Sequence, residues 1–129
     1  MKYALYDFLD SNSVNMIKQW ADGLQKAERG KLREKIDKLA MHGDALHPHM
    51  LSDSGVAGIQ KLRVQGGVKL RPLLCKGPVA LHTEYTLLMG AKEIGSKWSP
   101  KDAPSTANQN KKAVALDAIA RRKKHERIS

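Results

Sequence analysis

The chain of 129 residues has a single cysteine, few aromatic residues and no long apolar run. Because Cys75 stands alone, an intrachain disulfide is excluded and a reducing compartment is favoured, so we expect a cytoplasmic protein. An apolar stretch of about 18 residues, which a membrane-spanning helix needs, is missing. The N-terminal MKYALYDFLDSNS lacks the apolar core and cleavage site of a signal peptide, and we expect it to be mature sequence.

Acidic residues are scarce in the second half of the chain. The sequence holds 23 Lys and Arg against 13 Asp and Glu, a formal net charge of +10. Residues 1–57 carry 8 basic and 8 acidic residues, residues 58–101 carry 8 and 2, and residues 102–129 carry 7 and 3. Such a clustered basic field favours binding to a polyanion such as nucleic acid, or to an acidic protein, although it can also serve solubility alone.

The pattern of apolar and turn-forming residues predicts one α+β domain over residues 1–129. Its order is an N-terminal strand, two helices, a three-strand meander and a C-terminal helix, with a small antiparallel sheet and no β-α-β alternation. The expected strands are 2–9, 58–65, 67–76 and 80–90, and the expected helices are 14–24, 26–42 and a basic one over 111–127. Residues 96–110 are rich in Ser, Pro and Asn, which predicts a long polar loop.

Two short runs around Gly66-Gly67 alternate cationic and apolar residues. A two-residue loop at these glycines would mix arginine and leucine on both faces of the hairpin. A three-residue loop over 65–67 pairs residue 64 with 68 and residue 63 with 69. In this register the cationic side chains lie on one face of the hairpin and the apolar side chains on the other. It places Lys61, Arg63, Lys69 and Arg71 on one face, and Leu62, Val64, Val68 and Leu70 on the buried one.

Four cations on one face predict a bound anion. Like charges opposite one another on paired strands destabilise a sheet by a few tenths to ~1 kcal/mol per pair, so a ligand of opposite sign would relieve the repulsion. The alternative is a solvated outer face without a ligand, since exposed faces of antiparallel sheets are ordinarily polar.

The segments GIQKLRV, KLRPLL and EYTLLMGAKEI, followed by a polar-to-basic C-terminal segment, resemble the RelE/ParE toxin superfamily, and most closely its phage-derived HigB-like branch. The resemblance covers most of the chain. It implies a small curved antiparallel sheet with two helices on one face and a basic cleft on the other. It also implies the toxin of a type II toxin-antitoxin module, an endoribonuclease that cuts messenger RNA at the ribosome. An acidic antitoxin protein would be its partner, and no small-molecule cofactor is implied.

By motif position, Lys61, Arg63, Arg71 and Lys92 match the cleft cations of this family, which implies a catalytic role for them. In such nucleases the ribose 2′-hydroxyl attacks the adjacent phosphate. Preformed cations then stabilise the negative charge that gathers on the phosphoryl oxygens, and no metal is needed. Arginine suits this task because its planar fork binds two phosphate oxygens at once.

A general base is harder to assign. The family often supplies a tyrosine or histidine near the last strand or in the C-terminal segment, but residues 92–124 contain neither. His47 and His49, in the loop before the hairpin, are the expected acid/base candidates, although a lone histidine is more often structural. Two histidines are too few for a closed metal site, so no metal is expected.

Further RNA contacts are expected from Lys69, Lys97, Trp98 and Lys101. Trp98, flanked by lysines, could stack on an exposed base or instead fix its loop to the core. Two other functions stay open beside the nuclease. One is a ParE-like inhibitor of gyrase that acts through protein contacts, and the other is a non-catalytic phage protein that binds nucleic acid.

Overall fold

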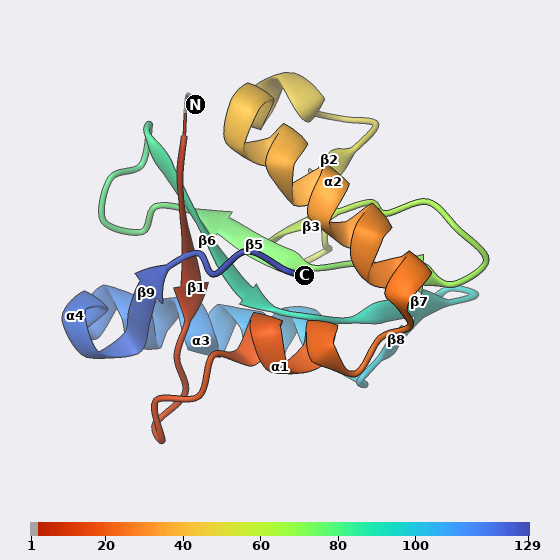
Figure 1. Cartoon of the computed structure of the whole chain (residues 1–129). Coiled ribbons are helices and arrows are strands. Elements are labelled where there is room, and N and C mark those ends of the chain that lie inside the picture. The colour runs from red at the N-terminus through yellow and green to blue at the C-terminus, as the bar shows by residue number, and fades with distance from the viewer. Residues whose placement is uncertain (1–2) are drawn as a thin grey trace.

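The computed structural model describes residues 3–129, and Figure 1 shows its arrangement. The helices are α1 (Met16–Asp22), α2 (Lys26–His42), α3 (Ala103–Leu116) and α4 (Ala118–Arg121), with a short 3₁₀ helix η1 (Gly43–Leu46). The strands are β1 (Ala4–Phe8), β2 (Leu51–Asp53), β3 (Gln60–Leu62), β4 (Lys69–Leu70), β5 (Leu73–Lys76), β6 (Glu84–Met89), β7 (Lys92–Ile94), β8 (Lys97–Ser99) and β9 (Arg122–Lys124). The α+β class predicted from the sequence is confirmed.

The strands form two sheets. A six-stranded sheet has the order β2-β3-β5-β6-β1-β9, and a three-stranded sheet has the order β4-β7-β8. Strand β1 runs parallel to β6, with Ala4 opposite Glu84 and Asp7 opposite Leu87, while the other pairs are antiparallel. A parallel pair needs a crossover connection, which the chain from α1 to β5 provides. Antiparallel pairing is thus confirmed for every pair except β1 with β6. The expected single small sheet of four strands is wrong, because residues 3–129 form nine strands in two sheets.

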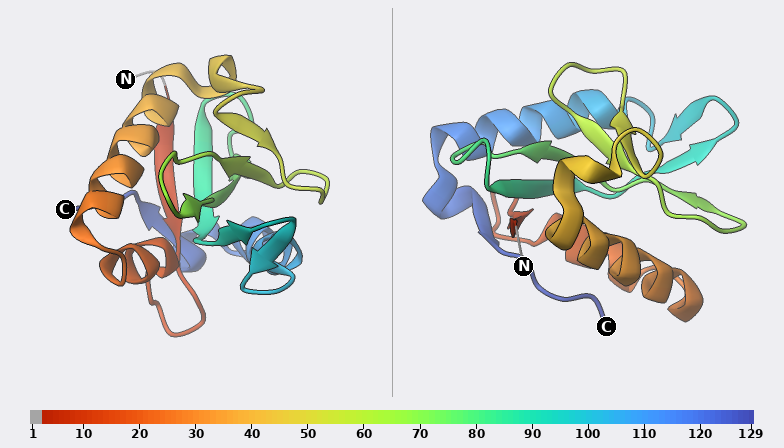
Figure 2. Two further views of the ribbon diagram at one scale, coloured as in Figure 1. Left: turned by 90° about the vertical axis from the view of Figure 1, so that its right-hand side faces the viewer. Right: turned by 90° about the horizontal axis from the view of Figure 1, so that it is seen from above.

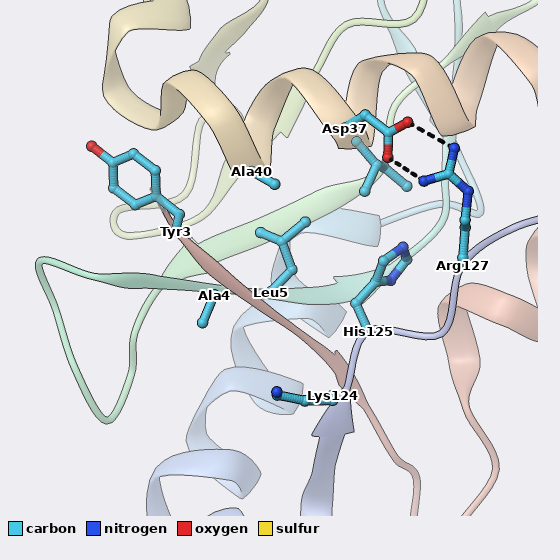
Figure 3. Close-up of a pocket in the computed structure, with 9 residues that line it drawn as sticks. Tyr3, Ala4, Leu5, Asp37, Ala40, Lys124, His125 and Arg127 are labelled. Carbon is cyan, nitrogen blue, oxygen red and sulfur yellow. Dashed lines mark hydrogen bonds and ion pairs between the residues drawn. The ribbon is translucent and has the colours of Figure 1, made fainter. Parts of the chain in front are cut away.

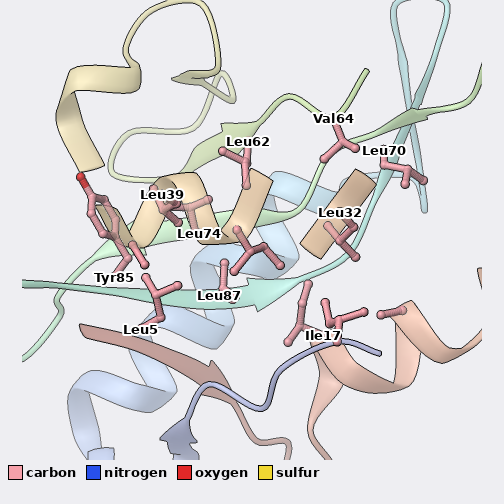
Figure 4. Packing of buried hydrophobic residues seen from close by; sticks show 14 of the residues in the cluster. Leu5, Ile17, Leu32, Leu39, Leu62, Val64, Leu70, Leu74, Tyr85 and Leu87 are labelled. Atoms are coloured by element: carbon pink, nitrogen blue, oxygen red, sulfur yellow. The ribbon is translucent and has the colours of Figure 1, made fainter. Parts of the chain in front are cut away.

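The six-stranded sheet is the middle of three layers (Figure 2). Neighbouring residues of a strand point to opposite faces, so Leu74 and Leu87 pack with α1 and α2, while Leu73 and Leu88 pack with α3. Figure 4 shows the first of these clusters, in which Ile17, Leu32 and Leu39 of the helices meet Leu62, Leu74 and Leu87 of the sheet. The face that the resemblance implies to be an open cleft is therefore covered by α3 over β5 and β6.

The two N-terminal helices lie close to their predicted positions. Helix α1 is shorter than 14–24 because Asn15, rather than Ser13, caps it: the Asn15 side chain accepts a hydrogen bond of 3.1 Å from the Lys18 amide. Helix α2 ends as predicted before Gly43, which has a φ of 49°. Within residues 3–129, no helix combines the length and the hydropathy needed to cross a bilayer.

The C-terminal third differs from the prediction. The region 96–110 is not one loop, because β8 and then α3 begin within it. Pro104 lies in the first turn of α3, where proline is compatible with the start of a helix. The helix predicted over 111–127 ends at Leu116. Residues 122–124 instead extend the sheet beside β1, because Arg122 binds the buried Glu84 and lies 3.7 Å over the Tyr6 ring. These long-range contacts override local helical propensity.

The central hairpin has a different register from the predicted one. Val64 pairs with Leu70 rather than with residue 68, so the loop spans residues 65–69 and Val68 is 42% exposed instead of buried. The chain leaves β3 at this point because β4 pairs with β7 in the smaller sheet. A shift of two residues preserves the side-chain parity, so Lys61, Arg63 and Arg71 still share a face.

Candidate nucleic-acid interface

Two of the predicted catalytic cations, Lys61 and Arg71, meet at one carboxylate, that of Glu93 on β7. The Lys61 ammonium and the Arg71 Nε donate to Glu93 Oε1 at 2.9 and 2.8 Å. Arg71 also donates through one terminal nitrogen to the backbone oxygens of Val64 and Leu70, at 3.4 and 2.9 Å. Its side chain is only 10% exposed, so Arg71 holds the hairpin and Glu93 in place.

Glu93 stays ionised in this setting. Burial raises the pKa of its carboxyl, but the hydrogen bonds from Lys61 and Arg71 and their positive charges outweigh that effect, so the pKa lies below its ordinary value. Both bonds fall on Oε1, and Oε2 accepts no hydrogen bond from within residues 3–129. The cluster therefore carries one excess positive charge, and Oε2 of its carboxylate has no hydrogen-bond donor within the described chain.

Trp98 completes the cluster. It lies opposite Glu93 in the β7–β8 ladder, which places both side chains on one face, and the Lys61 ammonium is 5.5 Å from the centre of its ring. One part of the indole packs against the second core cluster, and another part lines a groove. The two roles expected for Trp98, base stacking and fixing the loop, are therefore geometrically compatible.

The groove beside Trp98 has a volume of about 710 Å³ and brings together three of the predicted RNA contacts, Lys97, Trp98 and Lys101. The loop 54–56, Asp102 and the first turn of α3 also line this groove. Lys97 and Lys101 are exposed, so their charges are available to a polyanion in the groove. An aromatic ring flanked by lysines is the arrangement that binds single-stranded nucleic acid without strict sequence preference.

The remaining predicted cations differ in their positions relative to this cluster, and only Lys69 shares the face of Glu93 in the small sheet. Arg63 is half-buried on the face of Lys61 and Arg71, and its Nε donates to Ser52 Oγ at 3.3 Å. Lys69 is exposed and lies opposite Glu93 in the small sheet. Lys92 precedes Glu93 on β7, so its side chain leaves the strand on the other face. The structure therefore separates Lys92 from the catalytic group that the resemblance implies.

The two expected acid/base histidines lie elsewhere. His47 and His49 are exposed in the segment between η1 and β2. Burial raises the pKa of the nearby Asp44 carboxyl, but hydrogen bonds from Lys76 and Tyr85 lower it below its ordinary value, with a smaller effect of His47. The hydrogen bonds and ion pairs of Lys61, Arg71 and Glu93 in the described chain do not include either histidine. Glu93, which sequence reasoning missed, is the carboxylate that the structure places beside the cations.

A second polar cluster joins the two ends of the chain. Asp7 is fully buried and accepts hydrogen bonds from the Asn15 side chain, the Glu126 amide and His125 Nδ1, at 2.8, 2.8 and 2.7 Å. Figure 3 shows His125 and the ion pair between Arg127 and Asp37 beside a cavity of about 460 Å³. These contacts fix the C-terminal segment against β1 and α2, which gives the Asp7–His125 pair a structural role.

Metal ligands and a reactive thiol are the two other features that could give the chain chemistry. Among residues 3–129, no group of three or more His, Cys, Asp or Glu side chains could hold a metal ion. Cys75 is buried in the second core cluster, and this burial raises the pKa of its thiol to about 12. Cys75 is thus packed as a small apolar residue.

The sequence does contain a signal for the missed carboxylates. Residues 58–101 hold only two acids, Glu84 and Glu93, within a strongly basic segment. Both form ion pairs with arginines whose side chains are 10% exposed, Arg122 and Arg71. A rare acid in a basic strand region is thus a candidate partner for a buried cation.

Comparisons with known proteins give no relative for this chain. No protein-family model matches it, no curated protein matches it, and no solved structure matches it. The likeness to the RelE/ParE toxins therefore rests on the sequence motifs alone.

Proposed function

We propose that this chain is an RNA-cleaving toxin of the RelE/ParE type, which binds single-stranded messenger RNA in the groove beside Trp98 and cuts it next to Glu93. The observation that carries the proposal is the contact cluster of Glu93, Lys61, Arg71 and Trp98, which adjoins that groove through Trp98. It combines a proton acceptor, cations and a stacking platform. The RelE-like arrangement of the fold, the ribosome as the place of cleavage and an acidic antitoxin belong to the same proposal.

RNA binding is supported by charge and shape. Lys97 and Lys101 line the groove, and Lys61 and Arg63 add positive charge on the face of the six-stranded sheet that Arg71 shares. Phosphates would follow these cations while a base stacks on the exposed part of Trp98, a contact worth roughly 1–3 kcal/mol. Binding should therefore weaken steeply as salt is added.

Cleavage is supported by Glu93. Its free oxygen would take the proton of a ribose 2′-hydroxyl as that oxygen bonds to the adjacent phosphorus. The bond from phosphorus to the 5′-oxygen breaks, that oxygen takes a proton from water, and the products are a 2′,3′-cyclic phosphate and a 5′-hydroxyl end. Lys61 beside Glu93 would stabilise the charge on the phosphoryl oxygens.

The test uses purified protein with an end-labelled single-stranded RNA. We expect cleavage products with cyclic phosphate ends, lost in Glu93→Gln, and binding that is weakened in a variant with both Lys97→Ala and Lys101→Ala. Lys26→Ala serves as the matched control, because this exposed lysine begins α2 on the opposite side of the sheet. Salt-sensitive RNA binding without cleavage would contradict the nuclease proposal and support the alternative of a non-catalytic nucleic-acid-binding protein.

Two further measurements separate the remaining alternatives. Inducing the protein in bacteria and mapping RNA ends tests action on messenger RNA in the cell, and intact transcripts during growth arrest would contradict it. A DNA supercoiling assay with gyrase tests the ParE-like function, for which inhibition without RNA cleavage is the expected sign.

A further inference from the structure

A cavity lies between β1, α2 and the segment 124–127 (Figure 3), and we call it the α2 cavity. It shares no lining residue with the groove beside Trp98. Its volume of about 460 Å³ falls within the range of about 300–1,000 Å³ that is usual for small-molecule sites. Such sites combine an apolar lining with a few polar groups that orient the ligand, and the α2 cavity has both.

The apolar lining of the α2 cavity is formed by Tyr3, Leu5, Ile36 and Ala40. The last three are buried members of the first core cluster, and Tyr3 packs against that cluster. The Tyr3 ring is also held by Gly43, which lies so close that a Cβ at this position would be 2.3 Å from the ring. The lining is therefore preformed, and its aromatic ring favours an aromatic ligand.

His125 supplies the polar group of the α2 cavity. Its Nδ1 lies 2.7 Å from the Asp7 carboxylate, which also accepts hydrogen bonds from the Asn15 side chain and the Glu126 amide. Because this carboxylate is an acceptor surrounded by donors, Nδ1 carries a proton and donates it. Nε2 forms no hydrogen bond within residues 3–129, where the only fully buried side-chain polar atom without a partner is Gln60 Oε1. Nε2 is therefore accessible and free to bond to a ligand in the cavity.

The charged residues around the α2 cavity favour an uncharged ligand. Arg127 and Asp37 bind each other through two hydrogen bonds of 3.1 Å, so their charges are already compensated. Lys124 also lines the cavity, but it pairs with Tyr6 in the β1–β9 ladder, so its side chain leaves the sheet on the face opposite to Leu5. Figure 3 shows Lys124 and Leu5 on opposite sides of β1.

We propose that the α2 cavity binds an uncharged small molecule that combines an aromatic ring with a hydroxyl group, of the class of the alkylphenols. The hydroxyl bonds to His125 Nε2, and the ring with its alkyl group packs against Tyr3, Leu5 and Ile36. A hydroxyl suits this nitrogen because it donates to the lone pair of a neutral imidazole and accepts from an imidazolium. This binding is independent of the proposed function, because the RNA groove is formed by other residues.

The test titrates the purified wild-type chain, without RNA, and follows the methyl NMR signals of Leu5 and Ile36. The probes are para-ethylphenol, ethylbenzene, which lacks the hydroxyl, and para-ethylbenzoate, which carries a negative charge in its place. We expect para-ethylphenol to shift these signals with a dissociation constant below about 1 mM and to bind at least about fivefold more tightly than the other two, as one hydrogen bond predicts.

Three variants test the residues. His125→Asn removes Nε2 and keeps a side-chain amide that can donate to Asp7, so it should abolish the preference for para-ethylphenol over ethylbenzene. Ala40→Leu fills the cavity and should remove binding of both probes. His82→Asn, which changes an exposed histidine in the connection between β5 and β6, is the matched control and should leave both affinities unchanged.

Several outcomes would overturn this proposal. They are the absence of para-ethylphenol binding at about 1 mM, equal binding of ethylbenzene, tighter binding of para-ethylbenzoate, and a preference that His125→Asn retains. Signals that shift only outside the α2 cavity would also overturn it. Because the three probes are compared on the wild-type protein, the result does not depend on whether a variant folds. Failure of RNA binding or cleavage would leave this result standing.

Discussion

Replacing Glu93 with Gln removes the negative charge on which Lys61 and Arg71 converge and keeps the size of the side chain. The three side chains are at most 20% exposed, and the two bonds to Oε1 measure 2.9 and 2.8 Å. A hydrogen bond to a charged group contributes about 1.5–3 kcal/mol, and Gln retains one acceptor oxygen. We therefore expect Glu93→Gln to lower the free energy of unfolding by about 2 kcal/mol at neutral pH.

This loss should depend on pH with a definite sign. The pKa of Glu93 is lowered in the folded protein, so its stabilising effect is present above the pKa of the unfolded chain and disappears as the pH falls through the folded value. Urea denaturation of both proteins should show the full difference near pH 7 and a shrinking one below about pH 4. A difference below about 0.5 kcal/mol at pH 7, or one that is constant down to pH 3, would refute the ion-pair reasoning.

The same variant separates binding from chemistry. Loss of the Glu93 carboxylate, which lies opposite the groove residue Trp98 in the β7–β8 ladder, should leave RNA affinity equal or higher, because phosphates are no longer repelled by it. Cleavage should fall by about 10²–10⁴-fold, the usual contribution of a general base. Cleavage at the wild-type rate by Glu93→Gln would rule out the proposed role of Glu93, whatever its effect on stability.

Three further predictions concern the interior. Asp7→Ala should lower the free energy of unfolding by about 3–5 kcal/mol in urea denaturation, because its three donors lose their buried acceptor; a loss no larger than that of the exposed Asp53→Ala would contradict this. Gly90→Ala should cost about 3 kcal/mol and lower Tm, since its Cβ would lie 1.8 Å from the Trp20 ring, and an unchanged Tm would show that the ring can move. Cys75 should react with a thiol reagent only after denaturation, because burial raises its pKa to about 12; rapid labelling of the native protein would be the contrary result.

Periodicity in the sequence predicts the elements that bury a single face. Helix α2 follows the spacing of Leu32, Ile36 and Leu39, all of which are buried. Side-chain parity likewise placed Lys61, Arg63 and Arg71 together, although the register was off by two residues. Parity is robust because slipping by one residue would expose the whole apolar set, whereas slipping by two exposes only Val68.

Elements that are stabilised by contacts between residues far apart in the sequence could not be predicted from the local pattern of apolar and polar residues. Helix α3 contains Ser, Pro and Asn residues that favour loops, and it forms because Ala103, Ala107 and Val114 are buried against the sheet. Strand β9 depends on the contacts of Arg122 with Glu84 and Tyr6. Glu93 was missed for the same reason, because its partners lie 22 and 32 residues away along the chain.

The claim that RNA crosses the groove beside Trp98 is tested most directly by the affinity of Trp98→Ala for a labelled single-stranded RNA. If a base stacks on the indole, the dissociation constant should rise by about 5- to 150-fold, which corresponds to 1–3 kcal/mol. Lys26→Ala should leave it unchanged. An affinity of Trp98→Ala equal to that of the wild type, in a variant whose circular dichroism shows the native fold, would contradict the account.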